Sequence, residues 1–215
     1  MIRMLDVPDA APILFPEQNI SKLLNYLRTV WDELRNSPPA WWDHKHETTL
    51  VAGFFAELNN DERRMNAGIG FGHFAIEAQL IQLDRKGMPK QIGRTDIRFF
   101  YAIDFGPELI LEFKRLDNKA RLKKAYVLNG VKRFGTGQYS PNVDLGIMVG
   151  MVNGVVADES TSLQTYLQRA DVTVETSGTG LVAPSHMAEL DFDTHHHRPA
   201  CASPDILVGH MLLAR

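Results

Sequence analysis

Apolar and polar residues alternate along this chain in the patterns of helices and strands. Residues 17–36 and 46–60 both show the three-to-four-residue spacing of an amphipathic helix. In the second segment, Glu47 falls in the first turn, and Asp43 and His44 are candidates for its start. The apolar stripe of the first segment consists of Ile20, Leu23, Leu24, Leu27, Val30, Trp31 and Leu34. Two helices are therefore predicted before residue 61.

The middle of the chain favours strands. Residues 74–83 are β-like, whereas residues 84–94 hold turn-forming residues and are predicted to be a connector. Residues 95–103 and 108–116 are two further strands, and the short stretch 104–107 between them indicates a tight hairpin turn.

The remaining pattern completes an α/β fold. Residues 117–134 form a basic helix that Asp117 or Asn118 can cap, and residues 158–170 form another helix. The nearly unbroken apolar run at 143–155 is typical of a central strand covered on both faces. Residues 204–214 suit an edge strand. We expect a mixed central sheet flanked by helices.

One domain is expected to contain the whole chain, residues 1–215. Its core would span about residues 44–152 in the order helix, three strands, helix, strand. The helix at 17–36 would precede this core, and a C-terminal extension, 153–215, would follow it.

Composition narrows the functional classes. A net charge of −3 excludes bulk attraction to nucleic acid, although it permits a local basic patch. The single cysteine, Cys201, excludes an internal disulfide and a cysteine-based zinc cluster. Prolines and acids replace the apolar run of a secretion signal near the N-terminus, and no apolar stretch is long enough to span a membrane. We expect a cytoplasmic protein without a membrane partner.

Candidate chemistry lies on the predicted hairpin. Side chains two residues apart share a face of a strand, so Glu112 and Lys114 lie together, while Phe113 points to the opposite, core-facing side. Asp96 starts the preceding strand and, in an antiparallel hairpin, lies beside the end of its partner. The three polar side chains are therefore predicted to converge at one end of the sheet.

Two neighbouring carboxylates repel each other unless a cation lies between them. Mg²⁺, for which Mn²⁺ can substitute, would accept the carboxylates of Asp96 and Glu112 and the backbone carbonyl of Phe113. Lys114 would then orient or deprotonate a water molecule and neutralise phosphate charge. This pattern indicates metal-assisted hydrolysis of a phosphodiester.

Asp96 followed by Glu112-Phe113-Lys114 resembles the PD-(D/E)xK (restriction-endonuclease-like) nuclease superfamily, and the order of elements is similar to its αβββαβ core. Thr95 stands where the family name has proline. The resemblance implies an endonuclease in which Asp96 and Glu112 bind the metal, Lys114 assists the water and Glu47 supplies an additional or outer ligand. It also implies DNA rather than RNA as substrate and, by analogy with small bacterial members, defence against foreign DNA.

The basic helix after the hairpin is a candidate for binding nucleic-acid phosphates, although a solvated face explains such charges equally well. Gln138 and Tyr139 are further candidates to contact a phosphate or a base, unless they only end the helix. The proposed phosphate-binding residues are Lys119, Arg121, Lys123 and Lys124, and Lys132 and Arg133 extend the basic run.

Other interpretations stay open. Glu112 and Lys114 could form an exposed ion pair, and Glu47 could only complement a helix dipole. The chain could be an inactive nuclease-like module that binds nucleic acid or a protein, and a homodimer or a partner protein is not excluded. It could also be an unrelated metalloenzyme that uses the tail around 189–199, which is otherwise a polar loop; the candidate ligands there are Asp191, Asp193, His195 and His197.

Overall fold

The computed structural model describes residues 17–70, 72–76, 79–83, 89–94, 96–101, 108–139, 141–169 and 180–215. The turn predicted at 104–107 and Thr95 lie outside the described residues. Within the described ranges, no helix is both long enough and apolar enough to cross a membrane.

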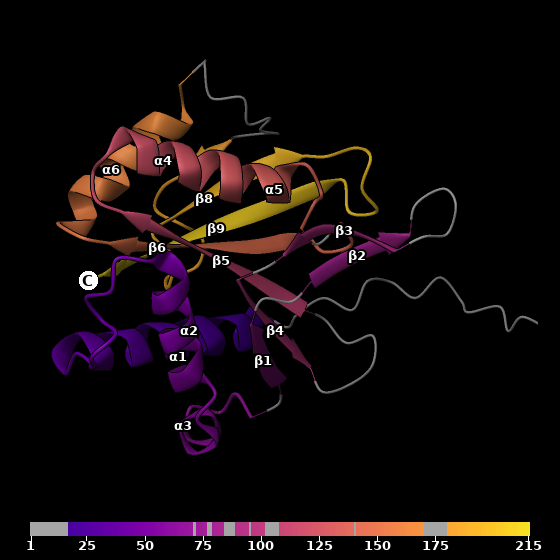
Figure 1. Ribbon diagram of the computed structural model, residues 1–215. Helices are drawn as coiled ribbons and strands as arrows, with labels where there is room; N and C mark the ends of the chain where they lie inside the picture. Colours follow the sequence, from indigo (N-terminus) through magenta and orange to yellow (C-terminus); the bar gives the residue numbers. More distant parts are fainter. Residues whose placement is uncertain are drawn as a thin grey trace, which may run out of the picture.

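A seven-stranded mixed sheet forms the centre of the molecule (Figure 1). In spatial order it contains β1 (Gly72–Ile76), β4 (Ile97–Tyr101), β5 (Glu108–Leu116), β6 (Leu145–Val152), β9 (Asp205–Ala214), β8 (Phe192–His197) and β7 (Leu181–Val182). Neighbouring strands are parallel from β5 through β6 to β9 and antiparallel elsewhere. The predicted α/β fold with a mixed central sheet is confirmed.

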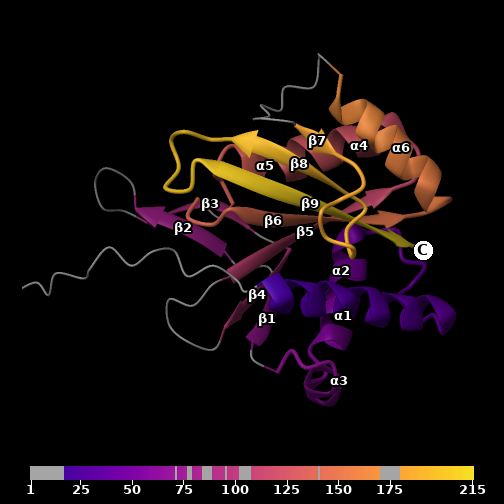
Figure 2. The same ribbon diagram turned by 180° about the vertical axis from the view of Figure 1, so that it is seen from behind.

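Helices cover both faces of this sheet, as Figures 1 and 2 show from opposite sides. One layer contains α1 (Glu17–Asn36) and α2 (Glu47–Leu58); the other contains α4 (Ala120–Tyr126), the π-helical turn η1 (Val127–Val131), α5 (Lys132–Gly135) and α6 (Val156–Leu167). The order helix, three strands, helix, strand is found only for the central sheet, as α2, β1, β4, β5, α4 to α5 and β6, because the described chain also forms one more helix and two more strands between α2 and β4. The short helix α3 (Asp61–Asn66) was not predicted.

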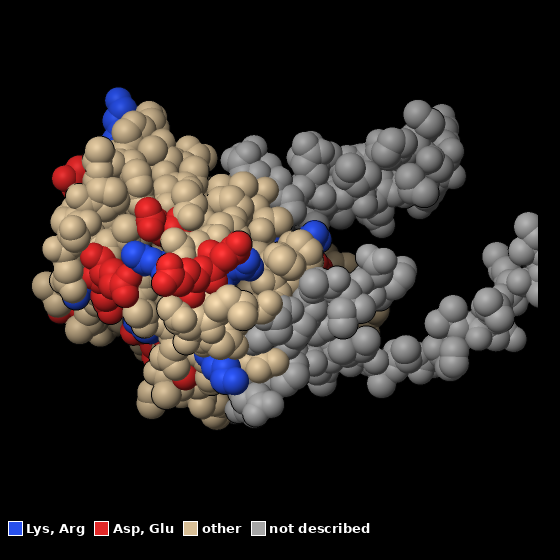
Figure 3. Space-filling view, turned by 90° about the horizontal axis from the view of Figure 1, so that it is seen from below, with Lys and Arg blue, Asp and Glu red and all other residues tan. Residues whose placement is uncertain are grey.

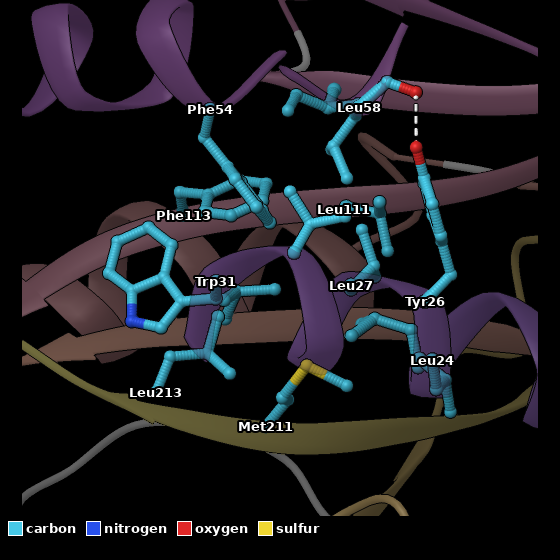
Figure 4. Packing of buried hydrophobic residues seen from close by; sticks show 14 of the residues in the cluster. Leu24, Tyr26, Leu27, Trp31, Phe54, Leu58, Leu111, Phe113, Met211 and Leu213 are labelled. Atoms are coloured by element: carbon cyan, nitrogen blue, oxygen red, sulfur yellow. Dashed lines mark hydrogen bonds between the residues drawn. The ribbon is translucent and has the colours of Figure 1, made fainter. Parts of the chain in front are cut away.

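The apolar stripe of α1 packs on the face of the sheet that carries Leu111 and Phe113 of β5 (Figure 4). Trp31 is fully buried with its ring 5.1 Å from that of Phe54, and its indole nitrogen donates to the carbonyl of Ala214. Phe113 lies in the same core, 5.9 Å from Phe54 between ring centroids. The hydroxyl of Tyr26 donates to the carbonyl of Leu58 at 3.0 Å. These contacts fix α1 and α2 against β5.

A second apolar core fills the space between the sheet and the helices after β5. It is built around Ile110, Met148, Val208, Leu212, Tyr126 and Phe134. Alternate side chains of β6 enter the two cores: Ile147 and Val149 lie in the first, and Met148 and Val152 lie in the second. The prediction that residues 143–155 hold a central strand is therefore correct.

Three predictions for the strands are wrong. Residues 205–214 form an inner strand because β9 pairs with β6 on one side and with β8 on the other. The segment interpreted as a polar loop is the strand β8, and its Thr194 and His196 side chains are buried. The segment 84–94, predicted to be a connector, ends in strand β3 (Pro89–Arg94), which pairs with β2 (Gln79–Leu83) in a separate two-stranded ribbon.

The predicted helix starts also need correction. The helix after β5 is capped by Lys119 without a side-chain cap bond, and Asn118 takes a left-handed conformation with φ of 61°. The backbone N–H of Asn118 donates to Glu159 Oε2 at 2.6 Å. The second helix begins after His46 rather than at Asp43 or His44.

A chain of hydrogen bonds runs through the second core. The hydroxyl of Tyr126 lies 2.9 Å from Nδ1 of His210, and Nε2 of the same ring lies 2.9 Å from the hydroxyl of Thr194. That hydroxyl also contacts Nε2 of His196 at 2.8 Å, and the His210 ring stacks on Phe192. Burial, with a smaller effect from His196, holds the pKa of His210 well below its ordinary value.

This depressed pKa predicts a pH-dependent stability. Below about pH 6.5 the unfolded chain protonates His210 while the folded chain does not, so the free energy of unfolding falls as the pH falls. His210→Gln has no titrating group at this position. The stability difference between wild type and His210→Gln should therefore shrink by on the order of 1 kcal/mol per pH unit below about pH 6.5. Urea denaturation at a series of pH values measures this; parallel curves would contradict it.

Candidate active site

The end of strand β5 extends beyond its neighbour β4. The two strands pair only from Ile97 with Leu111 to Phe100 with Glu108, although β5 continues to Leu116. Side chains replace the missing strand: the N–H of Phe113 donates to Asp96 Oδ2 at 2.9 Å. The N–H of Arg115 donates to Glu47 Oε2, also at 2.9 Å. Two predicted site residues thus satisfy the unpaired backbone donors of this strand edge.

The ammonium of Lys114 lies at the centre of the predicted site. Its Nζ is 2.9 Å from Glu112 Oε1, 3.2 Å from Glu47 Oε1 and 3.6 Å from Asp96 Oδ2. It also donates to the carbonyl oxygen of Phe113 at 2.6 Å. The structure therefore brings all the predicted catalytic and metal-binding groups together around one nitrogen atom. We call Glu47, Asp96, Glu112 and Lys114 the Lys114 cluster.

Glu112 is the most deeply buried member of the Lys114 cluster. Its side chain is 2% exposed, so an exposed ion pair does not describe it. Burial raises the pKa of Glu112 to about 7; the charge of Asp96 adds to this effect, while Lys114 opposes it. Its second oxygen, Oε2, is buried and has no hydrogen-bond partner among the described residues. An oxygen in this state is available to a proton or a metal ion.

Lys114 remains a cation in this environment. Burial by itself would lower the pKa of Lys114, but the carboxylates of Glu112, Asp96 and Glu47 together raise it above its ordinary value. The guanidinium of Arg133 lies 3.7 Å from Glu112 Oε1 and adds a second positive charge at the edge of the cluster. Three carboxylates thus face two cations.

Packing of α2 explains how Glu47 reaches this site from a distant part of the chain. Leu50 and Phe54 of α2 are buried in the core that also contains Phe113. Their position places the first turn of α2, where Glu47 lies, beside the end of β5. Glu47 therefore binds both Lys114 and the strand backbone, in addition to any effect on the helix dipole.

Arg133, which the sequence interpretation named only as an extension of the basic run, is a further candidate site residue. It belongs to α5, donates to the hydroxyl of Tyr139 and keeps 33% of its side chain exposed. Burial, reinforced by the charge of Glu112, raises the pKa of Tyr139 to about 12. The π-helical turn approaches Glu112 closely at Gly130, where a side chain would collide with Met148. In the sequence, Gly130 is the one sign that this turn lies close to Glu112.

The predicted phosphate-binding residues divide into two groups. Lys119, Arg121 and Lys124 are exposed on α4 or at its start. Lys123 is only 4% exposed; it donates to Asn118 Oδ1 at 2.9 Å and lies 3.4 Å from Glu159 Oε1. Lys123 therefore holds α6 to the loop after β5 and is not available to a nucleic acid.

The histidine-rich tail has other partners than a metal. Asp191 Oδ2 accepts from Arg28 and from the N–H of Leu212, at 3.0 and 2.7 Å. Asp193 is fully buried and accepts from the hydroxyl of Ser185 and the N–H of His186. His197 contacts Asp205. His195 is the fourth candidate ligand, and the described residues do not combine it with other candidates into a metal-binding group. The described part of the chain contains no group of three or more His, Cys, Asp or Glu side chains placed to hold a metal ion.

The Lys114 cluster is not such a metal-binding group either. Its three carboxylates surround the Lys114 ammonium instead of meeting at a position that a metal ion could occupy. The donor types nevertheless fit Mg²⁺ or Mn²⁺, which need few protein oxygens and retain water ligands. The buried, unpartnered Oε2 of Glu112, the carboxylate of Asp96 and the carbonyl of Phe113 are such oxygens.

Comparison of this chain with protein-family models, with curated proteins and with solved structures found no match. Any assignment of function therefore depends on the geometry of the Lys114 cluster itself.

The ion pairing in the cluster predicts a strong energetic coupling. In buffer with a chelator, Lys114→Met should destabilise the fold by about 3–5 kcal/mol, because it leaves buried carboxylates without their cation. The double variant Glu112→Gln/Lys114→Met should lose less than the sum of the single losses, with a coupling of about 0.5–3 kcal/mol. Urea denaturation of wild type, Glu112→Gln, Lys114→Met and the double variant measures this coupling.

Lys119→Met is the matched control, since Lys119 is 59% exposed and pairs only with Asp117 among the ion pairs of the described residues. It should change stability by less than about 1 kcal/mol. Strictly additive losses for Glu112 and Lys114 would show that the pair is not coupled.

Proposed function

We propose that this protein is a metal-dependent nuclease that hydrolyses phosphodiester bonds, with DNA as the favoured substrate. One observation carries the proposal: Glu47, Asp96 and Glu112 meet Lys114 at the unpaired end of β5. The order of the central-sheet elements from α2 to β6 supports the resemblance to PD-(D/E)xK nucleases, with the ribbon of β2 and β3 as an insertion. A role in defence against foreign DNA follows from that resemblance by analogy.

Asp96, Glu112 and the carbonyl of Phe113 would hold the Mg²⁺ or Mn²⁺ ion, since these three groups already lie at the cluster and Glu112 Oε2 lacks a partner. Such an ion supplies charge stabilisation for a phosphoryl oxygen and lowers the pKa of a bound water molecule.

The protein's own groups have separable tasks in this proposal. Lys114 is positively charged and donates hydrogen bonds, so it suits orienting a water molecule and neutralising a phosphate. Its raised pKa makes it unsuitable as a base while the carboxylates surround it. Glu47 holds the ammonium and the strand edge in place. Arg133, partly exposed beside Glu112, is placed to bind a phosphate oxygen.

Surface charge favours α4 over α1 and α3 as the face that meets nucleic acid, because the acids and bases of α1 and α3 balance each other. Seen from below, the molecule shows acidic side chains with lysine and arginine side chains among them (Figure 3). Asp32 and Glu33 of α1 and Asp61 of α3 are exposed, with side-chain exposures of 56, 54 and 86%. Each of these carboxylates is paired with an arginine, namely Arg35, Arg63 or Arg64, so this face offers a polyanion no net positive charge. The exposed cations of α4 lie on the other layer of the fold.

Cleavage assays test the proposal. Wild type, incubated with supercoiled plasmid, linear duplex, single-stranded DNA or RNA, should cleave in Mg²⁺ or Mn²⁺ and should stop in a chelator. Asp96→Asn and Lys114→Ala should each lower the cleavage rate at least about 100-fold, because each removes a group from the reacting centre. Asp117→Asn, a nearby carboxylate that pairs with Lys119 instead of Lys114, should retain activity.

Cleavage that survives both Asp96→Asn and Lys114→Ala would overturn the proposed site. Binding of nucleic acid without cleavage in any metal would favour the inactive binding module instead.

The helix α4 predicts a separate effect on affinity. If Arg121 and Lys124 contact phosphates of duplex DNA, Arg121→Ala and Lys124→Ala should each weaken binding and lower the slope of log affinity against log salt by about 1. Fluorescence anisotropy in Ca²⁺ or a chelator measures binding without cleavage.

Lys22→Ala is the control, because Lys22 is exposed on α1 in the opposite layer. Its salt slope should equal that of wild type. An equal effect of all three substitutions would show that α4 is not the contact surface.

A further inference from the structure

Lys114 occupies the place that a metal ion would need. The same oxygens that are proposed as ligands already contact its ammonium: Glu112 Oε1 at 2.9 Å, Phe113 O at 2.6 Å and Asp96 Oδ2 at 3.6 Å. Mg²⁺ binds oxygen at about 2.0–2.1 Å and repels a neighbouring ammonium. The two cations therefore cannot share this position.

The charge balance points to exchange between them. With its carboxylates ionised, the cluster has three negative charges from Glu47, Asp96 and Glu112 against the positive charges of Lys114 and Arg133. A divalent ion added to the present arrangement would leave an excess of positive charge at the centre. A divalent ion that replaces the ammonium there would balance the three carboxylates together with Arg133.

Only the side chain of Lys114 needs to move for this exchange. The backbone on either side is fixed, since the N–H groups of Phe113 and Arg115 are bound by Asp96 and Glu47 and β5 pairs with β6 along this stretch. The lysine side chain has several rotatable bonds and is 11% exposed at the strand edge. Withdrawal of the ammonium would release Glu112 Oε1 as well as the already unpartnered Oε2.

We propose that Lys114 is an internal counter-ion that a divalent metal must displace, so that this lysine sets the metal affinity of the site. It keeps the carboxylates compensated when divalent ions are scarce, and metal binding then releases it toward the substrate. This inference rests on the metal site of the proposed function, but it concerns metal binding and does not require cleavage.

Titration of the full chain with MnCl₂ and MgCl₂ by isothermal calorimetry tests the proposal. Lys114→Met and Lys114→Gln should bind Mn²⁺ at least about tenfold more tightly than wild type, because the competing charge is gone. Lys119→Met removes the same charge from an exposed position outside the cluster and should stay within about twofold of wild type. Cleavage should nevertheless fall in both Lys114 variants.

Thermal unfolding gives a second readout. Since Lys114→Met lacks the cation of the cluster, Mn²⁺ should raise its Tm by more than it raises the Tm of wild type. Folded Lys114 variants with wild-type or weaker affinity would overturn the proposal. So would Lys114→Met and Lys114→Gln proteins that stay unfolded in saturating Mn²⁺, because the lysine would then be a structural cation that metal cannot replace.

The two proposals can fail separately. Metal-dependent cleavage by wild type without tighter Mn²⁺ binding by the Lys114 variants would remove the counter-ion role and keep the nuclease. Tighter Mn²⁺ binding by those variants without cleavage by wild type would keep the counter-ion role and remove the nuclease. No binding of Mn²⁺ or Mg²⁺ by any of the proteins would overturn both.

Discussion

The contact of the Lys114 ammonium with three carboxylates is the interaction on which the site depends. It arises because β4 stops short while β5 continues, so that backbone donors on this edge need other acceptors. Asp96 and Glu47 provide those acceptors and, with Glu112, concentrate negative charge that a cation must neutralise. Strand pairing, helix placement and electrostatics therefore converge on one nitrogen atom.

Two apolar cores hold this arrangement rigidly. Phe113 lies in one core and Ile110 in the other, so a shift of β5 by one residue would exchange the side chains that fill the two cores. Glu112 and Lys114 are consequently presented side by side, with side chains that are 2% and 11% exposed. The same burial that raises the pKa of Glu112 strengthens its interaction with any cation.

Local patterns were sufficient to predict much of this site. Strand parity places Glu112 with Lys114, hairpin geometry places Asp96 near them, and helical spacing places Glu47 in the first turn of α2. The contact of the ammonium with Glu47 could not be predicted, because it depends on how α2 packs on β5. The alternation of side chains along β5 also did not predict the burial of Glu112 beside the second core.

Two of the wrong predictions share one physical cause, which is pairing between polar groups distant in the sequence. The strand β8 contains Thr194 and His196, whose burial depends on hydrogen bonds that continue to His210. Lys123 is buried because Glu159, on α6, lies beside it. A local pattern shows such residues as polar and therefore as exposed. The predicted loop and the predicted phosphate contact both failed for this reason.

The most direct test of the central claim is a crystal structure of the wild-type protein soaked in Mn²⁺, with the ion located by its anomalous scattering. The account predicts a peak bound by Asp96, Glu112 and the carbonyl of Phe113, with the Lys114 ammonium withdrawn from these oxygens. A structure without a peak at this place, and with Lys114 still held by the three carboxylates at saturating Mn²⁺, would contradict it.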